Sequence, residues 1–292
     1  MTVGALLLQQ MLFAWTGLHF ESLEFWLAIG LGGLLIWLAG LMRRGGNHNI
    51  SALIETLILL GITGFTGALI QYPMTVLSGP LADATLLKWD QFLGFNWTNF
   101  SLLFADSRAY LALFIIYDFF RLEGFYVLGF LCLTGQINKA WQVLTAASAC
   151  LLISVFLLPF FAADGSFVGC GLKVEGLPFH ANLCTYGPII HGLKDGAIRT
   201  IDGSMYYGLV SFPSFHVAGA LLLVWAVWHR RIGRWLSLIF NVLMGIAAIV
   251  IGGHYFVDII GGLILGLASI LIVKRLIPDA ASARSQHTGA PT

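Results

Sequence analysis

The chain has 292 residues, of which 29 carry a formal charge (15 Lys and Arg plus 14 Asp and Glu) and 58% are hydrophobic. A charged share of 10% is far below the roughly 25% of a soluble domain. A water-soluble globular enzyme, a disordered chain and a disulfide-dense small protein are therefore excluded. The net charge of +1 gives no electrostatic basis for binding nucleic acid, so no nucleic-acid partner is expected.

Apolar windows long enough to cross a bilayer recur along the chain. A spanning helix needs about 20 mostly apolar residues, so we predict an all-α integral membrane protein, a multi-pass helical bundle. The stretch 3–20 is weaker because Gln9 and Gln10 interrupt it, and either a first span or an interfacial helix is expected there. The predicted spans are Glu24–Met42, Ser51–Gln71, Tyr110–Thr134, Ala140–Phe160, Phe212–His229, Trp235–Gly253 and Tyr255–Val273.

The basic residues predict the orientation of these spans. Nine of the 15 lie in the short links after the first, third and fifth predicted spans or beyond the seventh. Because Lys and Arg gather on the cytoplasmic side, the long loops 72–109 and 161–211 are expected outside. Short inner links and small size favour a bacterial inner membrane, with these loops in the periplasm or exterior. Residues 276–292 are small and polar, and we expect a disordered cytoplasmic tail.

The first long loop carries an amphipathic pattern. Leu86, Trp89, Leu93 and Trp97 recur at helical spacing, which is typical of a segment that rests on the membrane surface; an ordinary packed loop is the alternative.

Two of the four cysteines, Cys170 and Cys184, lie in the second long loop. In an oxidising compartment they can form a disulfide, and two unpaired thiols are the alternative. The chain has no CxxC or Cys/His zinc spacing, so no metal and no cofactor are expected.

Three titratable residues mark the candidate site. His216 begins the Phe212 span, while His254 and Asp258 lie four residues apart where the last span begins. At that spacing a helix brings the imidazole and the carboxylate to one face. A carboxylate inside a membrane is costly unless it is paired, and His254 is its nearest partner. Both spans begin on the outer side, so the sequence predicts that the two histidines meet there.

At this point the motifs resemble those of a known family. PSFH opening a helix, followed 38 residues later by the histidine of GGHYFVD, resembles the second and third signature motifs of the type 2 phosphatidic acid phosphatase superfamily. FPSFH, with its bulky residue between Ser and His, is more similar to the inositol phosphorylceramide synthase branch, as are WDQFLGFNW and Tyr117-Asp118. The resemblance implies a six-helix catalytic membrane domain, which we place at 51–275, after an N-terminal helix or hairpin at 1–50.

The resemblance also implies a phosphohistidine mechanism on membrane lipids. His254 would attack phosphorus, Asp258 would orient it, His216 would protonate the leaving oxygen and Ser214 would hold the phosphate. The lipids implied are a phospholipid donor and a ceramide or diacylglycerol acceptor; with water as acceptor, the enzyme would be a lipid phosphate phosphatase.

Two phosphate-binding features of that family are missing here. The first motif, Lys-x6-Arg-Pro, is absent, and Ala248 stands where an Arg usually precedes the third-motif histidine. Lys194 and Arg199, just before PSFH, are the proposed substitutes on position alone. Arg121, between Asp118 and Glu123, is the other candidate, either as a clamp or as part of a buried ion pair.

Three other readings of these residues remain open. Ser214 could serve an intramembrane serine hydrolase, but no GxSxG surrounds it. His216, His254 and Asp258 have the ligand types of a metal site, without a fourth ligand. A lipid transporter without chemistry is the third alternative, although the chain shows no internal repeat.

Overall fold

The computed structural model describes residues 2–21, 23–104, 107–169, 180–202 and 208–278. This part of the chain is almost entirely helical, as predicted, with two short strands paired in parallel. Its elements are α1 (Thr2–Thr16), β1 (His19–Phe20), α2 (Leu23–Arg44), α3 (His48–Val76), α4 (Asp83–Phe92), α5 (Trp97–Leu102), α6 (Ser107–Leu133), α7 (Ile137–Phe161), α8 (Ser166–Gly169), α9 (His180–Lys194), β2 (Thr200–Ile201), α10 (Phe215–Val227), α11 (Arg231–Val250) and α12 (Phe256–Leu276).

Five of the described helices are long and apolar enough to cross a membrane: α2, α3, α7, α11 and α12. The chain is therefore an integral membrane protein, as the composition predicts. The α6 helix has 27 residues but carries several charges, and the apolar α10 helix has only 13 residues. At 1.5 Å per residue α10 is about 20 Å long, shorter than the roughly 30 Å of hydrocarbon.

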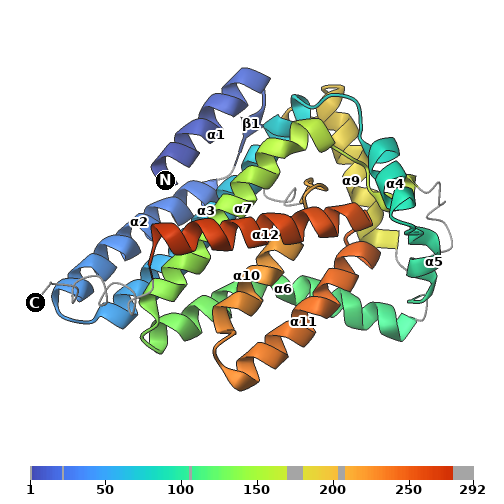
Figure 1. Cartoon of the computed structure of the whole chain (residues 1–292). Helices are drawn as coiled ribbons and strands as arrows, with labels where there is room; N and C mark the ends of the chain where they lie inside the picture. The colour runs from blue at the N-terminus through green and yellow to red at the C-terminus, as the bar shows by residue number, and fades with distance from the viewer. Residues whose placement is uncertain (1, 22, 105–106, 170–179, 203–207, 279–292) are drawn as a thin grey trace, which may run out of the picture.

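The bundle has two distinct ends (Figure 1). The short helices α4, α5 and α9 gather at one end, which we call the site end. The α2–α3, α6–α7 and α10–α11 links and the C-terminal end of α12 lie toward the opposite end. The links at that opposite end carry the basic residues that the sequence assigns to one side, so the predicted alternation of the spans agrees with the arrangement of the helices.

The N-terminal stretch and the first long loop form short helices. The α1 helix has 15 residues, about 22 Å, which is too short to cross the membrane; it packs along α3 instead. The amphipathic stretch in the first loop forms two helices, because Gly94 adopts φ +72° and ends α4 before α5 begins. Leu86 and Trp97 are buried in the protein, while Trp89 and Leu93 are more exposed.

Close packing of α10 against α12 sets the position of the site. A Cβ on Gly262 would lie 2.5 Å from the Ser214 carbonyl oxygen, and one on Gly266 would lie 3.0 Å from that of Ala218. Glycine is therefore required where the two backbones approach each other. This contact brings the start of α10, which carries His216, beside the start of α12.

Two predictions fall on residues that the structure does not describe. Cys170 and the side chain of Cys184 lie outside the described part, so the disulfide stays a prediction. The same is true of the tail from residue 279 onward.

Candidate active site

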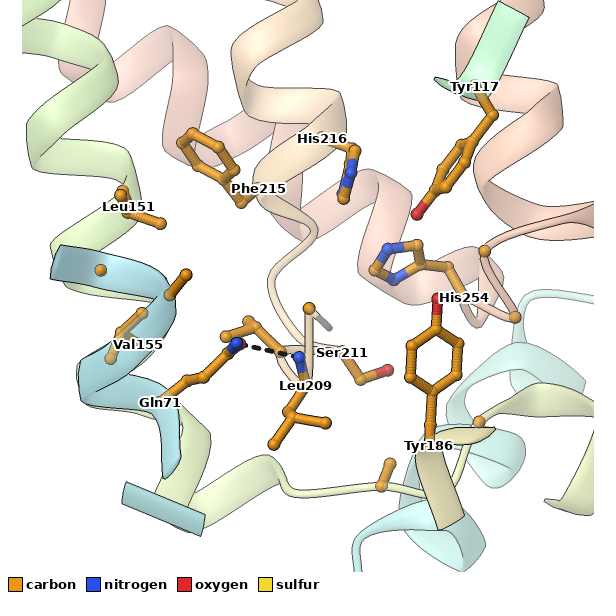
Figure 2. Close-up of a pocket in the computed structure, with 18 of the residues that line it drawn as sticks. Gln71, Tyr117, Leu151, Val155, Tyr186, Leu209, Ser211, Phe215, His216 and His254 are labelled. Atoms are coloured by element: carbon orange, nitrogen blue, oxygen red, sulfur yellow. Dashed lines mark hydrogen bonds between the residues drawn. The ribbon is translucent and has the colours of Figure 1, made fainter. Parts of the chain in front are cut away.

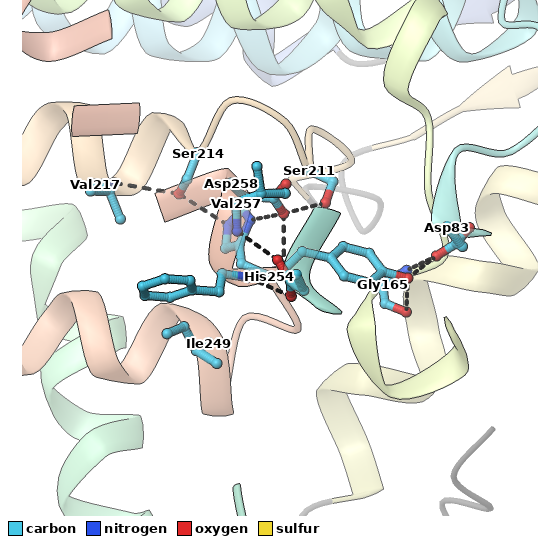
Figure 3. Close-up of polar contacts among 12 residues, drawn as sticks. Asp83, Gly165, Ser211, Ser214, Val217, Ile249, His254, Val257 and Asp258 are labelled. Atoms are coloured by element: carbon cyan, nitrogen blue, oxygen red, sulfur yellow. Dashed lines mark hydrogen bonds and ion pairs between the residues drawn. The ribbon is translucent and has the colours of Figure 1, made fainter. Parts of the chain in front are cut away.

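His254 and Asp258 contact each other as the spacing predicts. His254 Nδ1 lies 3.2 Å from Asp258 Oδ2, and both side chains are almost fully buried. His254 precedes α12 rather than lying within it, and Tyr255 is the N-cap. The same Oδ2 atom accepts hydrogen bonds from the Ser211 hydroxyl (2.7 Å) and the Tyr255 backbone N–H (2.9 Å). Figure 3 shows these bonds converging on Asp258, which therefore both caps the helix and orients the imidazole.

The other ring nitrogen of His254 faces the start of α10. His254 Nε2 lies 3.3 Å from the Ser214 hydroxyl (Figure 3). Ser214 is the N-cap of α10, and its oxygen accepts from the Val217 N–H at 3.4 Å. With Nδ1–H donated to Asp258, the lone pair of Nε2 points toward Ser214 and the free N–H groups of the α10 N-terminus, which suit an anion.

Two carboxylates of α4 fasten the loop around His254. Asp90 accepts from the backbone N–H groups of Phe256 (2.9 Å) and Val257 (2.8 Å), so a second carboxylate caps α12. Asp83 accepts from the buried Tyr255 hydroxyl at 2.8 Å and from the Gly165 N–H at 3.0 Å. These bonds tie the first long loop, the second long loop and the His254 segment together.

Aromatic rings hold His216. Its ring stacks on Tyr117 with centroids 4.9 Å apart and contacts Phe120 at 5.5 Å. The rings of His216 and His254 lie 6.1 Å apart, so α10 and α12 bring the two histidines together as predicted. A Cβ on Gly252 would lie 2.8 Å from the Tyr117 hydroxyl oxygen, so the glycines before His254 let the Tyr117 ring approach.

A cavity of about 350 Å³ opens between the two histidines and α3. His216, His254 and Tyr117 lie on one side of it, and Gln71, Leu151 and Val155 lie on the other (Figure 2). The Gln71 side-chain oxygen accepts from the Leu209 N–H at 2.7 Å, which fixes the segment 208–210 that leads to Ser211.

Among the described residues, Arg121 is the Lys or Arg that lines this cavity. It forms an ion pair with Asp118 on the same helix, and the side chains are 73% and 53% exposed, so the pair is not buried. Glu123 does not line this cavity, and its carboxylate accepts a hydrogen bond from the Asn241 side chain of α11 at 2.9 Å.

The two basic residues proposed as substitutes for the missing clamp lie away from the cavity. The Lys194 ammonium donates to the Ser78 hydroxyl and carbonyl and to the Gly79 carbonyl, closing α9 onto the end of α3. The Arg199 guanidinium donates to the Thr16 carbonyl at the end of α1. Neither residue lines the cavity, because position before PSFH in the chain does not fix where a long loop directs its side chains.

Sequence reasoning missed the supporting residues Asp83, Asp90 and Ser211. Asp90 lies in the WDQFLGFNW stretch, which resembles the synthase branch, but the resemblance assigns no role to Asp90. Asp83 and Ser211 carry no sequence signal, since the partners of Asp83 are 82 and 172 residues away and that of Ser211 is 47 residues away.

Comparison with known proteins gives one match. A family model described as the PAP2 superfamily matches residues 84–272, or 189 of the 292 residues. The match begins in α4 and ends in α12, and it includes His216, His254 and Asp258. No curated protein and no solved structure matches the chain.

Proposed function

The chain belongs to the PAP2 superfamily, and from this premise we propose that it is a lipid phosphotransferase that acts through a phosphohistidine intermediate on His254. The observation that carries the proposal is the hydrogen bond between His254 Nδ1 and Asp258, with the His216 ring 6.1 Å from the His254 ring at the cavity wall. A nucleophile oriented by a carboxylate, with a second histidine opposite, is the set of groups that in-line displacement at phosphorus needs.

In the first step His254 Nε2 attacks the phosphorus of a lipid phosphate or phosphodiester. A P–N bond forms, the P–O bond to the leaving group breaks, and His216 gives its proton to the departing oxygen. Asp258 accepts the Nδ1–H bond throughout and stabilises the positive charge that develops on the ring. Ser214 and the N-terminus of α10 lie beside the position proposed for the phosphate, where they can donate hydrogen bonds to its oxygens.

In the second step an acceptor hydroxyl gives its proton to His216 and attacks the same phosphorus. A new P–O bond forms, the P–N bond breaks, and His254 returns to its neutral form. A lipid or polyol hydroxyl makes the enzyme a transferase, and water makes it a phosphatase. Phe215, the bulky residue between Ser214 and His216 in FPSFH, lines the cavity beside His216. Its ring favours an apolar acceptor such as ceramide or diacylglycerol, as in the inositol phosphorylceramide synthase branch.

Arg121 is the phosphate clamp that we propose in place of Lys194 and Arg199. It lines the cavity and is exposed to it, and its planar guanidinium can bind two phosphate oxygens at once. Its partner Asp118 holds it before substrate arrives. Arg121→Gln should lower kcat/KM roughly 100-fold, while Arg44→Gln at the opposite end should leave it unchanged.

We further propose that the site end faces the exterior or periplasm of a bacterial inner membrane. The basic links at the opposite end support this orientation, because they match the cytoplasmic bias of Lys and Arg.

The test is a screen of lipid phosphates and phosphodiesters with the purified protein in detergent, with and without ceramide or diacylglycerol, and mass spectrometry of the products. A new phosphodiester that depends on the added acceptor supports the transferase, and free phosphate or a free head group alone identifies a phosphatase. Full activity in a His216→Ala, His254→Ala double variant would refute the mechanism. Lipid flux in vesicles without any chemistry would favour a transporter instead.

A further inference from the structure

The cavity beside the histidines has two chemically different parts. The part near His254 is polar, with Arg121, Asp118 and His216 on its wall. The part near α3 is apolar and is lined by small and aliphatic residues of three helices: Gly64, Gly67, Ala68, Leu151, Val155 and Ile190. Figure 2 shows Leu151 and Val155 facing the histidines across the open space.

The α3 wall lies outside the segment that matches the family. The family match begins at residue 84, and α3 ends at Val76. Nevertheless α3 supplies Gly64, Gly67 and Gln71 to the lining of the cavity. The part of the chain before the match therefore completes the site.

Small residues keep the apolar part open. A Cβ on Gly67 would lie 2.4 Å from the Leu151 side chain, so α3 and α7 are in close contact there. One turn earlier in α3, a Cβ on Gly64 would meet no atom within 4 Å, because this position faces open space. The Gly64 position is also exposed, and so is Arg121 of the neighbouring α6 helix. The cavity thus reaches the surface of the protein between α3 and α6.

We place this opening within the membrane rather than at its surface, because it lies well along both helices from the site end. Gly64 is 12 residues from the site end of α3, about 18 Å along the helix axis. Asp118 is 11 residues from the start of α6, a depth of about 17 Å. An exposed ion pair at such a depth is costly when it faces hydrocarbon, but it is compensated where a polar head group passes.

We propose that the apolar part of the cavity binds the hydrocarbon chain of the lipid whose phosphate is attacked by His254, and that this lipid enters between α3 and α6 past Gly64. The inference rests on the proposed function, since it assumes that the phosphate lies at His254. The arrangement matches one lipid molecule from head to tail, with cationic and imidazole groups at one end and aliphatic side chains at the other. A volume of about 350 Å³ is at the lower end for ligand sites, so it accommodates the head group and the first part of one chain.

The test separates binding from turnover by photo-crosslinking. The probe is phosphatidic acid with a diazirine in one acyl chain, added to the purified full chain in detergent. In the wild type and in His254→Asn, which lacks the nucleophile, crosslinks should map to α3 around Gly64–Gln71 and to α7 around Leu151–Val155. Gly64→Leu, which fills the open space, should reduce these crosslinks at least roughly tenfold.

Gly61→Leu is the matched control, because a Cβ on Gly61 also meets no atom within 4 Å and Gly61 does not line the cavity. It should leave the crosslinks unchanged. Gly64→Ala, a smaller change, should give an intermediate loss of crosslinks. It keeps the test decisive if the leucine variant does not fold.

Crosslinks that lie only on other helices, or that are equal in the wild type and both Gly64 variants, would overturn the inference. Crosslinking in His254→Asn does not depend on turnover. Crosslinks at α3, with no turnover even in the wild type, would therefore contradict the proposed function and leave the lipid-binding site supported.

Discussion

The two histidines of the site are supported in opposite ways. His254 lies among carboxylates: Asp258 bonds its ring, and Asp90 caps the helix that follows it. His216 lies among rings, with Tyr117 stacked on it and Phe120 in contact with it. The difference corresponds to their proposed roles. A nucleophile must keep one ring nitrogen fixed and gain positive charge, which a carboxylate favours, whereas an acid–base residue must be able to take and give a proton.

The support of His254 also links distant parts of the chain. Asp83 and Asp90 belong to the first long loop, yet they bond the segment that begins α12. Four variants test this comparison, in order of decreasing expected effect.

His254→Asn should abolish turnover, with a loss of roughly 10⁴-fold or more, because no other group can form the P–N bond. A radiolabelled lipid phosphate should leave an acid-labile adduct on the wild type and none on the variant. An unchanged thermal midpoint serves as the control for folding. An adduct that persists in the variant would assign the nucleophile elsewhere.

Asp258→Asn should lower kcat by roughly 10³- to 10⁴-fold while the adduct still forms slowly. The amide oxygen can still accept the bonds from His254, Ser211 and Tyr255, but the neutral amide cannot balance the positive charge that develops on the imidazole. Single-turnover kinetics measure the step directly. A loss smaller than tenfold would show that Asp258 only caps α12.

His216→Ala should lower turnover by roughly 10²- to 10³-fold with a lipid alkoxide as leaving group. The loss should be much smaller with a nitrophenyl phosphate, whose leaving group needs no proton. His254→Asn should show no such rescue. Equal losses with both substrates would contradict the role of His216 as the acid.

Asp90→Asn should have the smallest effect, a fall of a few-fold in kcat and of a few °C in thermal midpoint, since one of two caps of α12 is weakened. Burial, together with the charge of Asp258, raises the pKa of Asp90 above its usual value, although the two backbone N–H groups partly oppose this.

The raised pKa fixes the sign of a pH effect on stability. The folded state then favours the protonated carboxyl, so this contribution is present in full below the usual aspartate pKa and is lost as pH rises through the raised pKa. The midpoint of the wild type relative to Asp90→Asn should therefore increase as pH falls from neutral. A difference that is constant with pH, or that shrinks on acidification, would contradict this sign.

Much of the fold could be predicted because lipid imposes strong local rules. The long apolar windows predicted α2, α3, α7, α11 and α12 within a few residues. The failures lie in the segments outside the hydrocarbon. In the second long loop, Lys194 and Arg199 bond to backbone carbonyls instead of reaching the cavity.

By itself the sequence determined that this chain lives in a membrane, and it identified the pair His254 and Asp258. Both conclusions depend on short-range facts: charges are too few for a water-covered surface, and residues four apart meet at a helix start. Only the tertiary structure decided which cation lines the cavity and which residues form its far wall. Arg121 and Gly64 come from helices α6 and α3 that neither motif contains, and their distance in the chain says nothing about how closely packed helices bring them together.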